Sequence, residues 1–210
     1  MPAESEGFLR FPELIAPAFS HCFTLRDEVL QRPDQWVSHI GLSPQKKIVE
    51  AEQTHGNEAA FVDYTTDSPV RAVDALVARD KEVILAIRVA DCAPVYIIDE
   101  KSGLFALAHS GKKGTALNIF EKTVRLLIQH GTQDPEDLRV LVGPCIRPPY
   151  YEIDFASEIA EQAKACGITN YYDCGLTTAA DLSRFYSYRA EKGQCGRHWA
   201  LISCSSSSPI

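Results

Sequence analysis

Several features are missing from this sequence, and each absence excludes a class of protein. No uncharged apolar run approaches the roughly 20 residues that a membrane-spanning helix needs. The opening MPAESEGFLRFPEL lacks the basic stretch and apolar core of a secretory signal, so we expect no signal peptide. The net charge of −7 argues against nucleic-acid or membrane binding, because both favour basic faces.

The seven cysteines contain no CxxC pair, and their odd number does not fit a secreted disulfide framework. We therefore expect a cytoplasmic protein in which most cysteines are small buried residues. No internal repeat and no low-complexity linker is present, apart from the tail SCSSSSPI. The 210 residues predict one domain, with an N-terminal segment (1–18), a folded unit (19–204) and a flexible tail (205–210).

The hydrophobic pattern predicts interleaved strands and helices. Helical spacing begins at Thr115 and predicts a helix that ends at Gly131. The apolar run at 82–100 is interrupted at ADCAP, where Pro94 cannot donate to a sheet ladder, so we expect a bend or bulge there. A second helix is predicted over residues 154–167, and strands are predicted within 46–56, 82–100, 103–110, 137–144 and 197–203. This order indicates an α/β or α+β fold with a mixed sheet flanked by helices.

The sequence GKKGT (111–115) is similar to a phosphate-binding loop but does not match one. The P-loop lysine directly precedes the hydroxyl residue, whereas here Gly114 separates Lys113 from Thr115. A weaker reading survives, in which Lys112 or Lys113 binds a phosphate beside a helix start. By itself the motif favours the simpler interpretation, a solvated lysine turn.

Three residues lie where apolar strands end and carry metal-binding side chains: His55 in QTHG, Cys92 in ADCAP and His109 in LAHSG. Two histidines and one cysteine suit zinc and leave a fourth position open for water or substrate. The same residues also fit a metal-free site with Cys92 as nucleophile and a histidine as its base. Their spacing is not a local zinc signature, and composition alone favours buried core residues.

Other polar residues are weaker candidates. Gln53 and Asp91 neighbour the proposed ligands and could orient them. Arg189 in FYSYRAE could reach an anion, although a surface salt bridge is the default interpretation. Cys145 is interpreted as structural. The remaining histidines have no supporting neighbours and are interpreted as surface or packing residues: His21, His39, His130 and His198.

Six segments, taken in order, resemble the YfiH-like or laccase-domain family, whose members are also called polyphenol oxidases or YfiH-like purine nucleoside phosphorylases. The segments are EQTHG, VDALVA, ADCAPVYIID, AHSGKKGT, VGPCIRPPYYEID and FYSYRAEKGQCGR. They extend over about residues 20 to 203, which is nearly the whole chain. The resemblance implies a single α/β domain, related at a distance to the cysteine deamidase domain of a bacterial toxin.

The resemblance also implies a site and a chemistry. It assigns zinc, with copper as the alternative, to His55, Cys92 and His109 as ligands and catalytic residues. It implies phosphorolysis of adenosine, inosine and methylthioadenosine, together with adenosine deamination. Lys113, Arg189 and Gln53 are then expected to hold phosphate or substrate. We expect small-molecule partners, no nucleic acid or membrane, and a monomer or weak homodimer.

Two departures from the family pattern bear on the substrate pocket. Most members carry HAGWRGT where this chain has HSGKKGT, so Lys112 replaces a tryptophan and Lys113 replaces an arginine. Lysine keeps the charge but loses the planar, two-pronged hydrogen bonding of arginine. The region between YYEID and FYSYR is also contracted, and Thr177 stands where a cysteine is usual.

Three functions therefore remain open. The favoured one is a zinc-dependent purine nucleoside phosphorylase and adenosine deaminase. The others are a family member that binds metal with reduced catalysis, and a metal-free cysteine hydrolase or deamidase. A copper polyphenol oxidase is least favoured, because one set of two histidines and a cysteine cannot supply the several copper sites that oxygen reduction requires.

Overall fold

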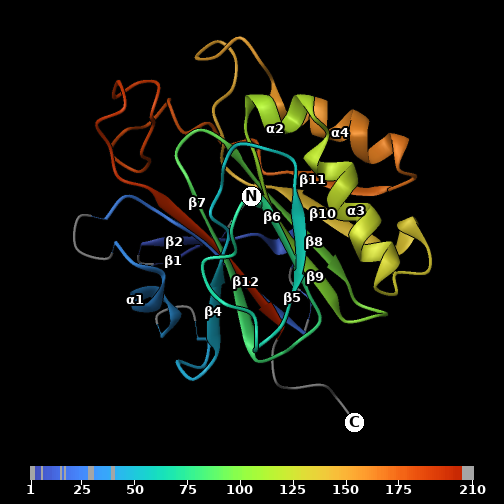
Figure 1. Cartoon of the computed structure of the whole chain (residues 1–210). Helices are drawn as coiled ribbons and strands as arrows, with labels where there is room; N and C mark the ends of the chain where they lie inside the picture. Colours follow the sequence, from blue (N-terminus) through green and yellow to red (C-terminus); the bar gives the residue numbers. More distant parts are fainter. Residues whose placement is uncertain are drawn as a thin grey trace.

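The computed structural model describes residues 3–5, 7–14, 16, 18–27, 31–38 and 41–204. Two six-stranded sheets and a group of helices form its layers (Figure 1). The first sheet has the order β1 (Ala3–Ser5), β2 (Phe8–Arg10), β3 (Phe19–Thr24), β12 (His198–Cys204), β7 (Val83–Val89) and β4 (Lys47–Glu50). The second has the order β11 (Asn170–Asp173), β10 (Leu138–Val142), β8 (Ala93–Asp99), β9 (Leu104–Ser110), β6 (Ala75–Ala78) and β5 (Ala59–Val62).

Helices cover the outer face of the second sheet. They are α2 (Lys112–Ala116), α3 (Ile119–Gln129) and α4 (Phe155–Ala165), and they lie together on one side of the molecule in Figure 1. The short helix α1 (Pro33–Val37) lies beside the first sheet, and two 3-10 turns, η1 (Pro12–Leu14) and η2 (Pro135–Asp137), complete the elements. No helix in the described ranges is both long and apolar enough to cross a bilayer.

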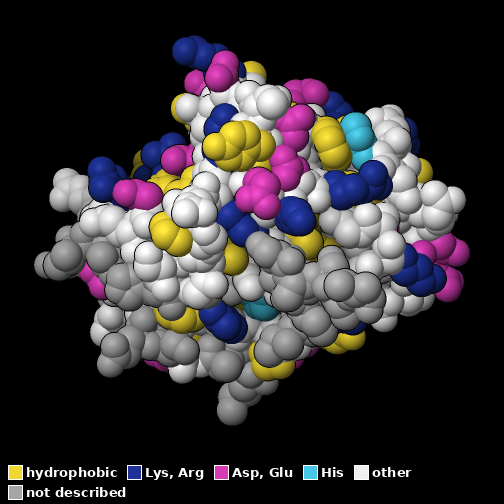
Figure 2. Space-filling model, turned by 90° about the horizontal axis from the view of Figure 1, so that it is seen from below, with side chains coloured by type: hydrophobic (Ala, Val, Ile, Leu, Met, Phe, Trp, Pro, Cys, Tyr) yellow, Lys and Arg dark blue, Asp and Glu magenta, His cyan; other side chains and the backbone are white. Residues whose placement is uncertain are grey.

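Alternating side chains explain the layers. In β9, Phe105 and Leu107 join the core between the two sheets, whereas Leu104, Ala106 and Ala108 join the core beneath α3 and α4. Strand residues alternate between faces, so one apolar strand serves two cores. Figure 2 shows basic and acidic side chains interspersed on one outer face, with hydrophobic side chains in separate small patches.

The predicted mixed α/β class and single domain are confirmed, with the strands divided between two sheets. The predicted strands at 46–56, 103–110, 137–144 and 197–203 correspond to β4, β9, β10 and β12. The described part of residues 1–18 supplies β1, β2 and buried core side chains such as Phe11 and Leu14. The predicted flexible tail, 205–210, lies outside the described residues.

Two expectations need correction. The interruption predicted at ADCAP within 82–100 is confirmed and separates β7 from β8, but the chain turns at residues 90–92 rather than at Pro94. Pro94 is the second residue of β8, before the pairing of β8 with β10 begins at Val95, so its missing N–H costs no bond in that ladder. The helix expected from Thr115 is also two helices, because Asn118 adopts a left-handed conformation and caps α3.

Candidate metal centre and cleft

His55, Cys92 and His109 come together at one end of the two sheets. His55 lies in the loop that follows β4, Cys92 lies between β7 and β8, and His109 lies near the end of β9. One ligand atom from each residue lies within 4.8 Å of the other two. His109 is buried, Cys92 is half-buried and His55 is exposed, so the cluster opens to solvent on the His55 side.

Asp74 holds both histidines in place. Its fully buried carboxylate accepts hydrogen bonds from His109 Nδ1 at 2.8 Å and from the backbone N–H of His55 at 2.9 Å. The backbone N–H groups of Thr54 and Gly56 and the Thr54 hydroxyl also donate to it. Because Nδ1 of His109 is bonded to Asp74, Nε2 is left to face Cys92.

The loop that carries His55 has an unusual backbone. Gln53 and His55 both adopt positive φ angles, 63° and 58°. Such conformations are uncommon for residues with a side chain and persist where the surroundings hold them. The donors to Asp74 hold one side of this loop. The Gln53 amide holds the other, because it donates to the Arg88 carbonyl at 2.6 Å and accepts from the Arg88 N–H at 2.8 Å.

Asp91 organises the segment that carries Cys92. One carboxylate oxygen accepts from the Thr178 hydroxyl at 2.6 Å, and the other accepts from the backbone N–H of Arg189 at 2.7 Å. The Asp91 carbonyl accepts from the N–H of Ile146 at 2.8 Å. Three loops distant in sequence are therefore joined at the residue next to Cys92.

Gly111 lets Cys92 approach the cluster. A Cβ atom at Gly111 would lie 2.7 Å from Cys92 Sγ, which is closer than real Cβ contacts allow. The backbone of Gly111 has φ −97° and ψ −175°, which any residue can adopt. Glycine is therefore required here for space and not for backbone freedom.

The charges of the cluster support one another. Burial raises the pKa of the Cys92 thiol, but hydrogen bonds from His109 and His55 outweigh it and lower that pKa. Burial lowers the pKa of His109, whereas the Asp74 and Cys92 side chains raise it overall. Burial raises the pKa of Asp74, and hydrogen bonds from His109 and Gly56 lower it overall. The cluster thus favours a thiolate at Cys92, which is the form that binds metals.

The cluster lies in a cleft of about 890 Å³. Apolar and aromatic side chains line part of this cleft: Val89, Ala90, Ile146, Tyr151, Phe155 and Tyr188. Basic side chains line another part: Arg88, Lys112, Arg189, Lys192 and Arg197. Glu52 and Asp91 are the acidic residues of its wall, so the cleft is locally basic within an acidic protein.

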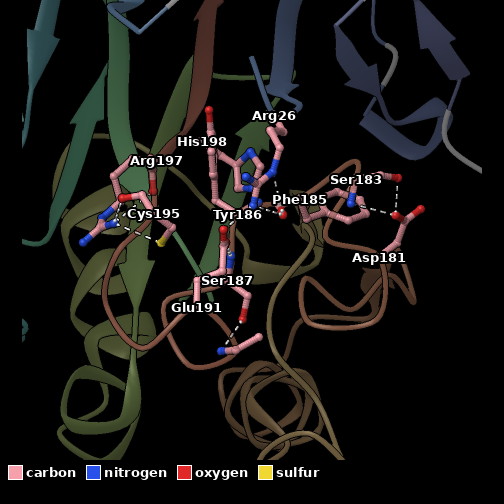
Figure 3. A network of polar contacts seen from close by, with 12 residues as sticks. Arg26, Asp181, Ser183, Phe185, Tyr186, Ser187, Glu191, Cys195, Arg197 and His198 are labelled. Carbon is pink, nitrogen blue, oxygen red and sulfur yellow. Dashed lines mark hydrogen bonds and ion pairs between the residues drawn. The ribbon is translucent and has the colours of Figure 1, made fainter. Parts of the chain in front are cut away.

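A polar network holds the loop that contributes Tyr188 and Arg189 to the cleft (Figure 3). Arg26 forms an ion pair of 2.6 Å with Glu191, whose carboxylate also accepts from the N–H of Ser187 at 2.9 Å. His198 Nε2 accepts from the N–H of Tyr186 at 2.7 Å. The loop is therefore held on both sides of Arg189: Tyr186 is bonded to β12, and Glu191 is paired with Arg26, which follows β3.

The other residues singled out from the sequence have varied positions. Arg189 and Gln53 line the cleft, but the Gln53 amide is committed to Arg88. Lys113 is exposed and lies outside the cleft wall, where its neighbour Lys112 is found instead. Cys145 is fully buried, and burial raises the pKa of its thiol.

The other histidines of the described residues lie away from the cluster. His21 and His198 are buried, and each accepts a hydrogen bond from a backbone N–H. His130 ends α3 and stacks on Phe61. The interpretation of these three as packing or surface residues agrees with these positions, and His39 lies outside the described residues.

Sequence reasoning missed Asp74, although it lies in VDALVA, one of the motifs used for the resemblance. An acidic residue within an apolar run is a usable signal, because a buried carboxylate needs several hydrogen-bond donors. The role of Gly111 had no such signal, since the contact that it permits is 19 residues away in sequence.

The chain matches a known family over most of its length. The family model described as multi-copper polyphenol oxidoreductase laccase matches residues 21–165 and 153–205. The chain belongs to this laccase-like, or YfiH, family.

Curated relatives and solved structures fall in the same group. A Staphylococcus aureus protein named purine nucleoside phosphorylase YlmD is 31% identical over 87% of this chain and 78% of its own length. A Campylobacter jejuni protein named purine nucleoside phosphorylase Cj1217c is 30% identical over 74% of this chain and 76% of its own. The crystal structure of YlmD from Geobacillus stearothermophilus has a TM-score of 0.85 at 22% identity, covering 97% of this chain and 98% of that one. This last likeness establishes the shared fold.

Proposed function

We propose that this chain is a zinc-dependent purine nucleoside phosphorylase that also deaminates adenosine, with adenosine, inosine and methylthioadenosine as substrates. The observation that carries the proposal is the cluster of His55, Cys92 and His109 in a cleft with both aromatic and basic walls. The names of the relatives in Staphylococcus aureus and Campylobacter jejuni support the same reaction class.

The three residues fit a zinc ion. Two imidazoles and a thiolate whose ligand atoms lie within 4.8 Å of one another form a suitable donor set with one open position. His109 has its second ring nitrogen bonded to a carboxylate, as metal-binding histidines usually do. Copper prefers similar ligands, so metal supply decides between the two ions. When bound, the metal supplies a Lewis acid that polarises a substrate atom or water.

The rest of the cleft meets the needs of phosphorolysis. In this reaction a phosphate oxygen forms a bond to ribose C1′ while the C1′–N9 bond breaks, and the leaving purine takes up a proton. Basic side chains on the cleft wall, with Arg189 foremost, would hold phosphate beside the sugar. Lys113, which the sequence suggested for this contact, lies outside the wall. Tyr151 and Phe155 offer aromatic surface for the purine. Deamination instead replaces the amino group at C6 with oxygen from water and releases ammonia.

The test is chromatographic product analysis after zinc-loaded protein has been incubated with adenosine, with and without phosphate. Adenine that forms only with phosphate supports phosphorolysis, and inosine that forms with or without phosphate supports deamination. Cys92→Ala should abolish both activities, whereas Cys166→Ala, at the end of α4, should leave both unchanged. Bound zinc without either product would favour the reading of a family member with reduced catalysis.

A specific geometry favours one second candidate, a metal-free cysteine hydrolase or deamidase. Cys92 bonds to His109, and His109 bonds to Asp74, which is the arrangement of a nucleophile, its base and an orienting carboxylate. The two candidates respond differently to reagents. A chelator should remove activity from a zinc enzyme and leave a cysteine hydrolase active, whereas thiol alkylation of chelated protein should inactivate only the latter.

A further inference from the structure

A carboxylate spans two of the cations at the edge of the cleft. Lys112 Nζ lies 3.2 Å from one oxygen of Glu152, and Arg189 Nη2 lies 3.9 Å from the other. All three side chains are more than half exposed. Exposed ion pairs of this kind contribute little free energy, so another anion can replace the carboxylate at small cost.

The backbones of both residues are held beside the cluster of His55, Cys92 and His109. Lys112 follows Gly111, the residue that packs against Cys92 Sγ. The backbone N–H of Arg189 is bonded to Asp91, which precedes Cys92. The Arg189 guanidinium also lies over the Tyr151 ring, 5.4 Å from its centroid. The backbones of the two residues are thus placed independently, while their exposed side chains remain free to converge on a shared ligand.

We propose that Lys112 and Arg189 form the subsite for inorganic phosphate, and that the carboxylate of Glu152 is a built-in competitor which phosphate displaces. This inference rests on the proposed phosphorolysis and names the residues that select its second substrate. It assigns the phosphate contact to Lys112 rather than to Lys113, which lies outside the cleft wall. Phosphate carries more charge and more oxygen atoms than a carboxylate, so it can hydrogen-bond to both cations at once. The Glu152 carboxylate lies 3.2 Å from Lys112 but 3.9 Å from Arg189.

The experiment is isothermal titration of zinc-loaded protein with inorganic phosphate, which requires no turnover. Glu152→Gln should tighten phosphate binding about two- to fivefold, because the competing charge is removed and the two cations remain. Lys112→Ala should weaken binding by about tenfold, as expected for the loss of a charged hydrogen bond. The matched control Lys113→Ala should leave the affinity unchanged.

A double variant separates competition from a general charge effect. If Glu152 acts through Lys112, Glu152→Gln should improve phosphate affinity less in a Lys112→Ala background than in the parent protein. Equal losses in Lys112→Ala and Lys113→Ala, weaker binding in Glu152→Gln, or no phosphate binding by the parent protein would overturn the inference.

The outcomes also distinguish this inference from the proposed function. Phosphate binding that follows the predicted order, without adenine release from adenosine, supports the subsite and contradicts phosphorolysis. Phosphate-dependent adenine release with unaltered affinity in Glu152→Gln and Lys112→Ala supports phosphorolysis and contradicts the subsite.

Discussion

The floor and the rim of the cleft are built in opposite ways. At the floor, Asp74 is fully buried and its carboxylate accepts from both histidine residues and two of their neighbours. At the rim, Glu152 meets Lys112 and Arg189 through exposed, loosely spaced ion pairs. Breaking the hydrogen bonds of a buried group costs much free energy, whereas exposed ion pairs exchange partners readily. The floor is therefore suited to fixing ligands, and the rim is suited to exchanging them.

Breaking the floor at Asp74 should have the largest effect. Asp74→Asn removes the buried charge. It also replaces one accepting carboxylate oxygen with an NH₂ group, which would face the N–H and O–H donors around Asp74. We expect a loss of roughly 2–5 kcal/mol in the free energy of unfolding and loss of stoichiometric zinc binding. Urea denaturation and metal analysis after gel filtration measure the two effects.

A second buried aspartate provides the control for Asp74. Asp99 is also buried and accepts from the backbone of Lys101 and Ser102 and from the hydroxyls of Ser102 and Thr132. Asp99→Asn should destabilise the fold by a similar amount and leave zinc stoichiometry intact. Equal zinc loss in both variants would show that Asp74 acts only through general stability.

Crowding the floor at Gly111 should have the next largest effect. In Gly111→Ala the new methyl carbon would lie 2.7 Å from Cys92 Sγ, so the thiolate must move away from it and from its place beside the histidines. We expect zinc affinity to fall by about 10- to 100-fold, measured by competition with a chromophoric chelator. Lys113→Ala, in the short helix α2 that Gly111 precedes, should retain the parent affinity. Unchanged affinity in Gly111→Ala would remove the steric argument.

The histidines outside the floor should produce a pH dependence of stability. Burial lowers the pKa of both His21 and His198 to about 4, against the ordinary 6.5. The unfolded chain therefore takes up these protons first as the pH falls from 6.5 to 4, and folding stability falls with it. The slope is at most about 1.4 kcal/mol per pH unit for each histidine.

Urea midpoints at pH 7.5 and pH 5 measure this loss. In His198→Gln the midpoint should be lower than that of the parent at pH 7.5, and the further decrease on going to pH 5 should be smaller. A variant that loses as much as the parent between the two pH values would show that other groups cause the acid sensitivity.

Loosening the loop that carries Arg189, by a change at Glu191, should have the smallest effect. Glu191→Gln weakens the ion pair with Arg26 but keeps an acceptor for the N–H of Ser187. We expect a stability loss of about 1 kcal/mol and a rise of about threefold in the KM for phosphate, because the loop that carries Arg189 becomes less ordered. Steady-state kinetics at saturating nucleoside tests this, and a changed kcat with an unchanged KM would contradict it.

The sequence determined the local features of this protein. Helical spacing predicted α3 and α4, and apolar runs predicted β4, β9, β10 and β12, because these periodicities are set by near neighbours in the chain. Family motifs pointed to His55, Cys92 and His109, which the structure places together.

Only the tertiary structure decided how distant segments meet. One apolar run became β7 and β8 in different sheets, because the chain turns at residues 90–92 between two cores. Packing also placed Lys112 rather than Lys113 on the cleft wall, and brought Asp74 beneath both histidines and Gly111 against Cys92. A residue's immediate neighbours in sequence carry no record of such contacts, since they depend on strand order, register and the space left between side chains.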